Sequence, residues 1–428
     1  MTEQPSALER RNFPVLTGQS TLASAAWMMA SPSVVLTFLA VALDMPIFLV
    51  GALVSIRQTA SSLTDIFFFD AIAKIKNRKR ALSVADLILA LCFGATVIAV
   101  LFGDKLQIMI VFIVCVFVMG AVDEMQQLLE TDFISDNLTS QSRRTFKYAQ
   151  MALGGLVAVA LTWIAHELTL ELPPMHRHSI VVAIGITCFA LSAFAILAVR
   201  DLTPADAKKE HSIRSPLKAL SNYFENTASM MRQGWFRKFI ALRMIFACVT
   251  LAVPFFSLIS AEAHHDSNRG LTALIISYAM GYIVAGPLWG ALNKISHRLV
   301  MVLSALLVVA AGSVLATMHI LDLDHDVRLH AAALFTVTVA VRGIVAVISL
   351  YFMDIAPKDQ RVNGIAVARS FVRITMIGLS ATLAAVAHLH ETVWAIIFIT
   401  LLSMLAAAVS FRLTRKDRES ELGSAQTS

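Results

Sequence analysis

Twelve long apolar runs dominate the sequence and restrict the chain to one kind of environment. Apolar residues fill 57% of its 428 positions, charged residues fill 15%, and the mean hydropathy is +0.72. A helix needs about 20 apolar residues to cross the hydrocarbon core of a bilayer, and the runs lack the alternation typical of barrel strands. We therefore expect an all-α polytopic membrane protein with transmembrane helices near 18–41, 46–70, 81–102, 108–130, 146–170, 180–199, 237–260, 271–293, 299–320, 330–354, 363–388 and 392–413.

The positions of lysine and arginine predict the orientation of these helices. Cytoplasmic loops of membrane proteins carry an excess of both residues. Of the 35 lysines and arginines, 26 fall on one side of the predicted helices, 4 on the other and 5 inside helices. We therefore expect the protein to lie in the inner or plasma membrane, with both termini in the cytoplasm. The net charge of +6 then reflects topology, so we expect the bilayer and no nucleic acid as a partner.

One long polar stretch divides the chain into two halves. Its second part, 215–233, spaces apolar residues as in an amphipathic helix on a membrane surface, although a plain tether fits equally well. The predicted organisation is a cytoplasmic tail at 1–17, a six-helix bundle at 18–200, a central cytoplasmic loop at 201–236, a second six-helix bundle at 237–413, and a cytoplasmic tail at 414–428.

A basic loop occurs twice in the chain, once in each half. Both copies follow the second predicted helix of their half, and 220 residues separate them. This spacing indicates two parallel repeats of six helices each. The repeated residues are Ala71, Lys74, Ile75 and Arg78 in the first copy, and Ala291, Lys294, Ile295 and Arg298 in the second.

In helix layout and loop motifs the sequence resembles the major facilitator superfamily. That family has the loop pattern G-x-x-x-D-R-x-G-R-[RK] after helix two and a second pattern, P-x-x-x-R-x-x-G, after helix ten. The matching positions are Arg78 and Lys79 in the first loop, Gly290 and Arg298 in its repeat, and Pro357, Arg361 and Gly364 after helix ten.

The sequence departs from the family pattern at its acidic position, where Lys74 and Lys294 replace the acid, and at the first glycine, where Asp70 stands. The resemblance implies two pseudo-symmetric six-helix bundles that rock about a central solute site. It also implies that these loop residues form the cytoplasmic gate.

Charged side chains inside the predicted helices are candidates for the solute site, because an ionised group in a bilayer is costly without a partner. Arg57 lies in the middle of helix two and is either an anchor for an anionic solute or half of an internal ion pair. Arg342 lies in the middle of helix ten. The repeat offset places it opposite Asp123 and Glu124 of helix four, so it either attracts these acids across the cavity or binds solute.

Asp123 and Glu124 are the candidates for proton coupling. Burial raises the pKa of a carboxyl group and a nearby arginine lowers it, so a buried acid with a movable arginine partner can take up and release a proton. The alternative is a gating cluster, because this end of helix four approaches the cytoplasm.

Other polar residues of the helices complete the predicted site. Gln58 adjoins Arg57, and Tyr278 and Tyr282 lie four residues apart in helix eight, where they either line the cavity or pack between helices. Three further arginines lie in the inner thirds of their helices, where long side chains reach the interface. We expect these three to be structural anchors: Arg243, Arg369 and Arg373.

Ten of the twelve histidines fall at or near the predicted outer surface. Metal capture or pH sensing would suit such a set. The simpler interpretation is that histidine escapes the selection against outer lysine and arginine. The cysteines all lie in apolar runs and are expected to be buried, unreactive thiols: Cys92, Cys115, Cys188 and Cys248.

The sequence contains no phosphate-binding loop and no hydrolase motif, so we expect no enzyme, cofactor or metal site. It predicts a monomeric, proton-coupled secondary transporter for a small organic solute, and the arginines favour an anionic or amphipathic solute. A multidrug efflux antiporter is one alternative, although helix five keeps only Gly154 and Gly155 of the antiporter signature and lacks its proline. A membrane sensor or assembly protein that transports nothing is the other.

Overall fold

A computed structural model describes residues 7–73, 75, 77–200, 225, 227–357 and 361–425. The described part is built of helices and contains no strand. Most of the predicted surface helix at 215–233 lies outside the described residues.

The first half of the chain forms eight helical segments besides a short turn of 3₁₀ helix. Pro32 starts a brief π-helical segment, η1, which breaks the first long helix into α1 and α2. The segments are α1 (Ala7–Met29), η1 (Pro32–Leu36), α2 (Thr37–Ala42), α3 (Ile47–Ala73), α4 (Arg78–Phe102), α5 (Lys105–Asn137), α6 (Ser140–Leu168), α7 (Pro174–Ala195) and the 3₁₀ turn η2 (Ile196–Ala198).

The second half follows the same plan. Its first long helix is interrupted at Leu251 and resumes as α10, which carries Pro254 in its first turn. The segments are α9 (Gly234–Thr250), α10 (Ala252–His264), α11 (Gly270–Asn293), α12 (His297–Ile320), α13 (Val327–Ile355), α14 (Arg361–Leu389) and α15 (Thr392–Ala425).

Within the described residues, twelve helical stretches are long and apolar enough to cross a membrane. This number confirms the count predicted from the apolar runs, and the fold class is confirmed with it. The two interrupted helices, α1–α2 and α9–α10, are each counted as one span. The four cysteines are free and buried, as predicted.

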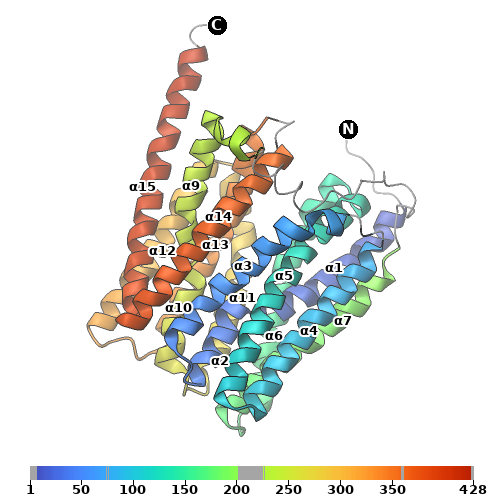
Figure 1. Cartoon of the computed structure of the whole chain (residues 1–428), viewed down its shortest axis with the longest axis vertical. Coiled ribbons are helices and arrows are strands. Elements are labelled where there is room, and N and C mark those ends of the chain that lie inside the picture. Colours follow the sequence, from blue (N-terminus) through green and yellow to red (C-terminus); the bar gives the residue numbers. More distant parts are fainter. Residues whose placement is uncertain are drawn as a thin grey trace.

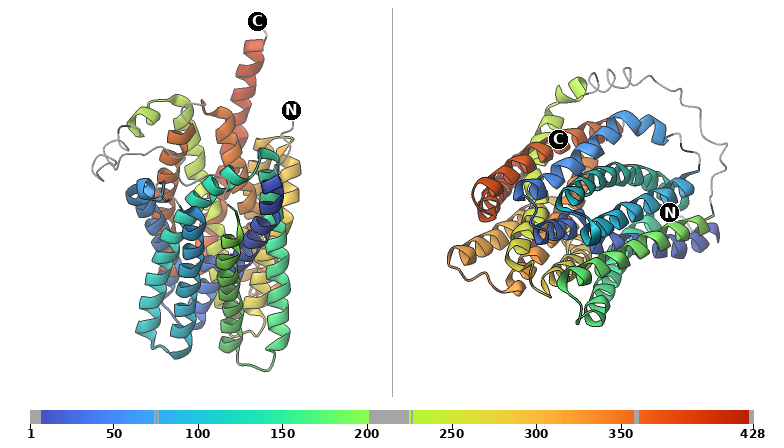
Figure 2. Two further views of the ribbon diagram at one scale, coloured as in Figure 1. Left: turned by 90° about the vertical axis from the view of Figure 1, so that its right-hand side faces the viewer. Right: turned by 60° about the horizontal axis from the view of Figure 1, so that its bottom comes forward.

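The helices gather into two groups that lie side by side, α1–α7 and α9–α15 (Figures 1 and 2). Two long contacts join the groups, α3 against α14 and α6 against α11. Both ends of the chain lie on one side of the molecule, which we call the termini side (Figure 1). The opposite side is called the far side below.

Arg177 ties the two groups together on the far side. Its side chain is 1% exposed and donates to the carbonyl oxygens of Thr169, Leu170 and Leu172, which belong to its own half. The same guanidinium donates to the carbonyl oxygen of Asn268 in the other half, at 3.1 Å. An arginine predicted to lie in an outer loop thus holds two loops of different halves in one place.

Small residues permit the close approach of α6 and α11. A Cβ at Gly155 would lie 2.9 Å from the carbonyl oxygen of Ala279 and still closer to the side chain of Ile283. Packing therefore explains the glycine at position 155, because a larger residue there would force the two helix groups apart.

We expect Gly155→Leu to destabilise the protein by about 1–3 kcal/mol, the usual cost of overpacking a close contact. Gly94→Leu is the matched control, because no atom lies within 4 Å of a Cβ at that position. Thermal unfolding in detergent should show a lower midpoint for Gly155→Leu and an unchanged one for Gly94→Leu. Equal midpoints would contradict the packing of α6 on α11.

Candidate functional site

A small cavity of about 120 Å³ lies between the two helix groups, where both interrupted helices pass. Its lining includes Pro32 of η1, Leu251 and Pro254 at the break between α9 and α10, and Arg57 and Gln58 of α3. Interrupted helices are typical of transporter binding sites, because they expose backbone groups to a cavity. A drug-sized ligand needs roughly 300 Å³ or more, so this cavity is too small to hold one in the present structure.

Arg57 lines the central cavity and is also half of an ion pair. Its Nη2 lies 2.6 Å from Oδ2 of Asp123 on α5. Its guanidinium carbon lies 5.3 Å from the ring centre of Trp27 on α1. Arg57 thus forms an internal ion pair and also belongs to the lining of the central cavity.

Arg342 of α13 lies against aromatic side chains rather than acids. It donates to the hydroxyl of Tyr282, and its guanidinium carbon lies 3.8 Å from the centre of that ring. The Tyr282 hydroxyl is 3.1 Å from that of Tyr278. The Nε of Arg342 is buried without a partner, and within the described part of the chain no carboxylate lies within ion-pair distance of it.

Arg373 of α14 joins the two helix groups through acids of the first half. It forms ion pairs with Asp65 of α3 and Glu124 of α5, and it donates to the carbonyl oxygen of Ser61 at 3.4 Å. Arg369, one turn earlier, lies 3.4 Å from Glu124. We call Asp65, Glu124, Arg369 and Arg373 the inter-bundle ion cluster.

The inter-bundle ion cluster corrects the expectation that these arginines are interfacial anchors. Arg373 is only 9% exposed and Glu124 only 2%. The long side chain of Arg373 reaches inward to its acids instead of outward to the lipid headgroups. The cluster also changes the expected partner of Glu124, which is Arg373 rather than Arg342.

Arg243 of α9 is the third arginine in this region. It lies within electrostatic range of Arg369 and Arg373. Unlike them, it forms no hydrogen bond or ion pair with any residue that the structure describes. With Arg57 and its partner Asp123, this region holds four arginines and three acids, so positive charge is in excess.

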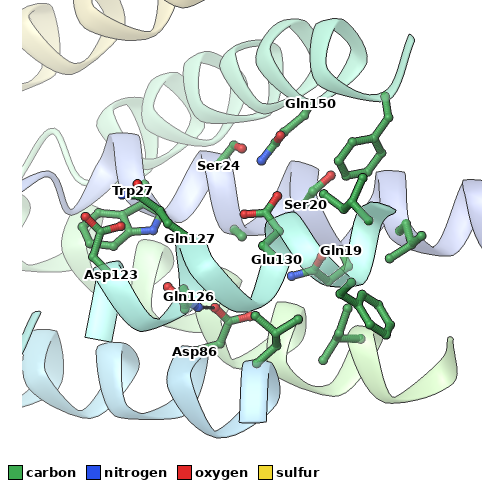
Figure 3. Close-up of a pocket in the computed structure, with 17 residues that line it drawn as sticks. Gln19, Ser20, Ser24, Trp27, Asp86, Asp123, Gln126, Gln127, Glu130 and Gln150 are labelled. Atoms are coloured by element: carbon green, nitrogen blue, oxygen red, sulfur yellow. Dashed lines mark hydrogen bonds between the residues drawn. The ribbon is translucent and has the colours of Figure 1, made fainter. Parts of the chain in front are cut away.

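A second cavity, of about 80 Å³, lies inside the first helix group (Figure 3). Its lining carries Asp123, Glu130 and, from α4, Asp86, which the sequence analysis did not single out. Amide and hydroxyl groups supply most of the remaining polar lining: Gln19, Ser20, Ser24, Gln126, Gln127 and Gln150. The sequence could have indicated Asp86, because it is a single acid in an otherwise apolar stretch of α4, the third predicted transmembrane helix.

The repeated basic loops tie the sixth helix of each half. Lys79 donates to the carbonyl oxygen of Val199 at 3.1 Å, and Arg298 donates to that of Phe411 at 2.6 Å. Arg298 also lies 4.4 Å from the Phe411 ring centre. These contacts give the loops a structural role within their own halves.

The other loop-motif residues divide into two groups. Lys294 and Pro357 are exposed, and Gly364 is buried where a Cβ would meet Phe352 at 2.9 Å. Lys74 and the side chains of Asp70 and Arg361 lie outside the described residues.

Histidines on the far side take part in hydrogen bonds between segments. Nδ1 of His319 lies 2.6 Å from Oδ2 of Asp324, and Nε2 of His330 lies 3.0 Å from the carbonyl oxygen of Asp324. Burial of Asp324 opposes its ionisation, but the hydrogen bond and the nearby charge of His319 outweigh it and lower the pKa of this carboxyl group. The ligand atoms of Asp322, Asp324 and His325 lie within 4.8 Å of one another on this face.

Comparisons with known proteins show which family model and which solved structures the chain is similar to. The model of the Major Facilitator Superfamily matches residues 239–427. Among solved structures, the inward-open xylose transporter XylE from E. coli aligns with 94% of this chain and 96% of its own, with a TM-score of 0.68 and 12% identity. The nucleoside transporter NupG aligns with 95% of this chain and 98% of its own, with a TM-score of 0.63 and 11% identity.

Together these findings define a helical integral membrane protein with a transporter fold. The Major Facilitator Superfamily model thus covers the second half of the chain, and the structural likeness shows the same fold over both halves.

The curated relatives add no activity. The uncharacterized protein Rv2209 of Mycobacterium tuberculosis is 26% identical over 297 residues, which cover 68% of this chain and 56% of that relative. A counterpart in Mycobacterium bovis gives the same figures. The chain thus spans about half the length of the curated relatives it matches.

We expect Arg373→Ala and Glu124→Ala each to lower stability strongly, because removing one partner of a buried ion pair costs about 3–5 kcal/mol. The double variant should lose clearly less than the sum of the two single losses, since the residues form one network. Thermal unfolding of the purified proteins measures this coupling. Additive losses would show that Arg373 and Glu124 do not interact.

Proposed function

We propose that the chain is a secondary transporter that moves a small anionic organic solute across the membrane by alternating access, coupled to protons. The family and the fold support transport rather than an enzymatic reaction. Solved structures with the same fold carry the names of transporters for xylose, nucleosides and, in the human protein MFSD10, organic anions. Their substrates differ, so fold alone does not select one.

The observation that carries the anionic assignment is Arg342. An arginine inside a membrane needs a compensating charge, yet among the described residues Arg342 forms no ion pair, donates to the hydroxyl of Tyr282 and keeps a buried Nε without a partner. A carboxylate or phosphate group of a solute would supply both the charge and the missing acceptor. Arg243, which has no partner among the described residues, adds to the same positive field.

The proposed coupling uses the pair of Arg57 and Asp123. Both face cavities, Arg57 the central one and Asp123 the one inside the first helix group. When a solute anion occupies Arg57, Asp123 loses its cation and the neutral acid becomes its stable form, so the carboxyl takes a proton. Glu124 can act in the same way when Arg373 withdraws during rocking of the two halves.

We place the protein in the inner or plasma membrane. In the proposed orientation, the termini side faces the cytoplasm. The excess of lysine and arginine on that side supports it.

We expect Arg342→Ala to abolish binding of the solute and Arg342→Lys to keep part of it, because lysine restores the charge but not the fork of donors. Purified protein would be screened by thermal shift against mono- and dicarboxylates, organic phosphates, nucleosides and pentoses. The stabilising compound would then be followed into proteoliposomes. Arg328→Ala, which changes an exposed arginine in the first turn of α13, is the control and should behave as wild type. Stabilisation of Arg342→Ala by the same compound would refute the assignment.

We expect Asp123→Asn to lose uptake driven by a pH gradient while it keeps exchange of labelled for unlabelled solute. Asparagine cannot carry the proton, but it leaves the cavity almost unchanged in shape. Flux in proteoliposomes with and without a pH gradient separates the two activities. Gradient-driven uptake at the wild-type rate would remove Asp123 from the coupling mechanism.

A further inference from the structure

Asp86 is a buried acid that the transport cycle described above does not use. It lies in the third turn of α4 and is 1% exposed. Its two carboxyl oxygens accept from Nε2 of Gln126 at 2.5 Å and from Oγ of Ser192 at 2.7 Å. Figure 3 shows it at the floor of the cavity inside the first helix group, facing Gln126.

Asp86 differs from the other membrane acids of the first half in the nature of its partners. Asp65, Asp123 and Glu124 each contact an arginine. Asp86 has only neutral partners, and among the described residues no lysine or arginine forms an ion pair with it. An ionised group buried in an apolar interior without a counter-charge is costly, and the neutral acid avoids this cost.

The partners of Asp86 can serve both protonation states. Arginine only donates, so it fits a carboxylate alone, whereas a hydroxyl and an amide each donate and accept. Ser192 already does both, because its Oγ accepts from Nε2 of Gln19 at 2.9 Å while it donates to Asp86. Gln126 can turn its amide oxygen toward Asp86 when the acid carries a proton. The site can therefore bind and release a proton without leaving a polar group unsatisfied.

A polar cavity connects Asp86 with two other acids. Asp86, Asp123 and Glu130 all line it, and its volume of about 80 Å³ has room for about two water molecules. Glu130 is partly exposed and lies 3.4 Å from the exposed Lys147 toward the termini side. Both charged groups that line the cavity with Asp86, namely Asp123 and Glu130, come from α5, while the lining residues of α1, α6 and η2 are uncharged.

We propose that Asp86, held by Gln126 and Ser192 inside the first helix group, is a proton-binding site that exchanges with the termini side through the cavity past Glu130. The proton comes from water in the cavity and returns to it, and no other bond changes. Proton binding at Asp86 needs no solute, and only its use in coupling rests on the proposed transport function.

Infrared difference spectroscopy of the purified full chain tests this directly, because a protonated carboxylic acid has a carbonyl stretch that a carboxylate lacks. Raising the pH of the wild type should remove such a band. Asp86→Asn should lack the band altogether. Asp123→Asn, the same change on an arginine-paired acid of the same cavity, should keep it. A band that persists in Asp86→Asn, or disappears only in Asp123→Asn, would overturn the proposal.

A second pair of variants keeps the test valid if Asp86→Asn does not fold. Gln126→Leu and Ser192→Ala each remove one hydrogen bond to Asp86, so each should shift the frequency of the band and the pH at which it disappears. Thr187→Ala is the control, because it changes an exposed hydroxyl of α7 that bonds only to its own helix. Unchanged spectra in both Gln126→Leu and Ser192→Ala would place the proton elsewhere.

Transport assays test the proposed function separately from the proton site at Asp86. If the band belongs to Asp86 but no compound is moved in proteoliposomes, the proposed function fails and the proton site stands. If solute is moved and the band does not depend on Asp86, the proposed function stands and this site is wrong.

Discussion

The cost of placing charge inside a membrane is the constraint on which the rest of this structure depends. Arg373 meets it by reaching from α14 to Asp65 and Glu124 of the other half. The residue that is most expensive to bury therefore joins the two helix groups. In the alternating access proposed above, the groups would rock against each other, so these ion pairs would either stay together as the pivot of the motion or exchange partners during it. In both cases the energetics of the proposed transport cycle would pass through a few charged side chains.

Two charged side chains without a compensating charge indicate where ligands bind. Arg342 is surrounded by aromatic rings and hydroxyls, and Asp86 by an amide and a hydroxyl. Among the described residues, Arg342 has no acid as a partner and Asp86 has no lysine or arginine, and the two lie in different halves. An anionic solute would complete the first and a proton the second. This division gives a physical basis for coupling, because each ligand neutralises a charge that the fold leaves open.

The apolar runs were sufficient to predict the helices, because the membrane imposes length and composition on every span. They also exposed Arg57, Arg342, Asp123 and Glu124 as rare charges. Their partners were harder to predict. The repeat offset set Arg342 against Asp123 and Glu124, but an offset in sequence says nothing of the direction in which a side chain points.

Other features were missed for similar reasons. Arg373 seemed interfacial from its depth in the helix, yet it bonds Glu124 from 249 positions away, a contact that only tertiary packing creates. Pro32 and Pro254 stand 222 residues apart, close to the repeat spacing, and their positions could have marked the two interrupted helices that line the central cavity.

The most direct test of the central claim uses the organic acid that best stabilises the protein. It compares the transport of this acid with that of its uncharged amide in wild-type proteoliposomes. The account predicts that the acid is transported and that the amide is transported at least tenfold more slowly. Equal rates for acid and amide would contradict it.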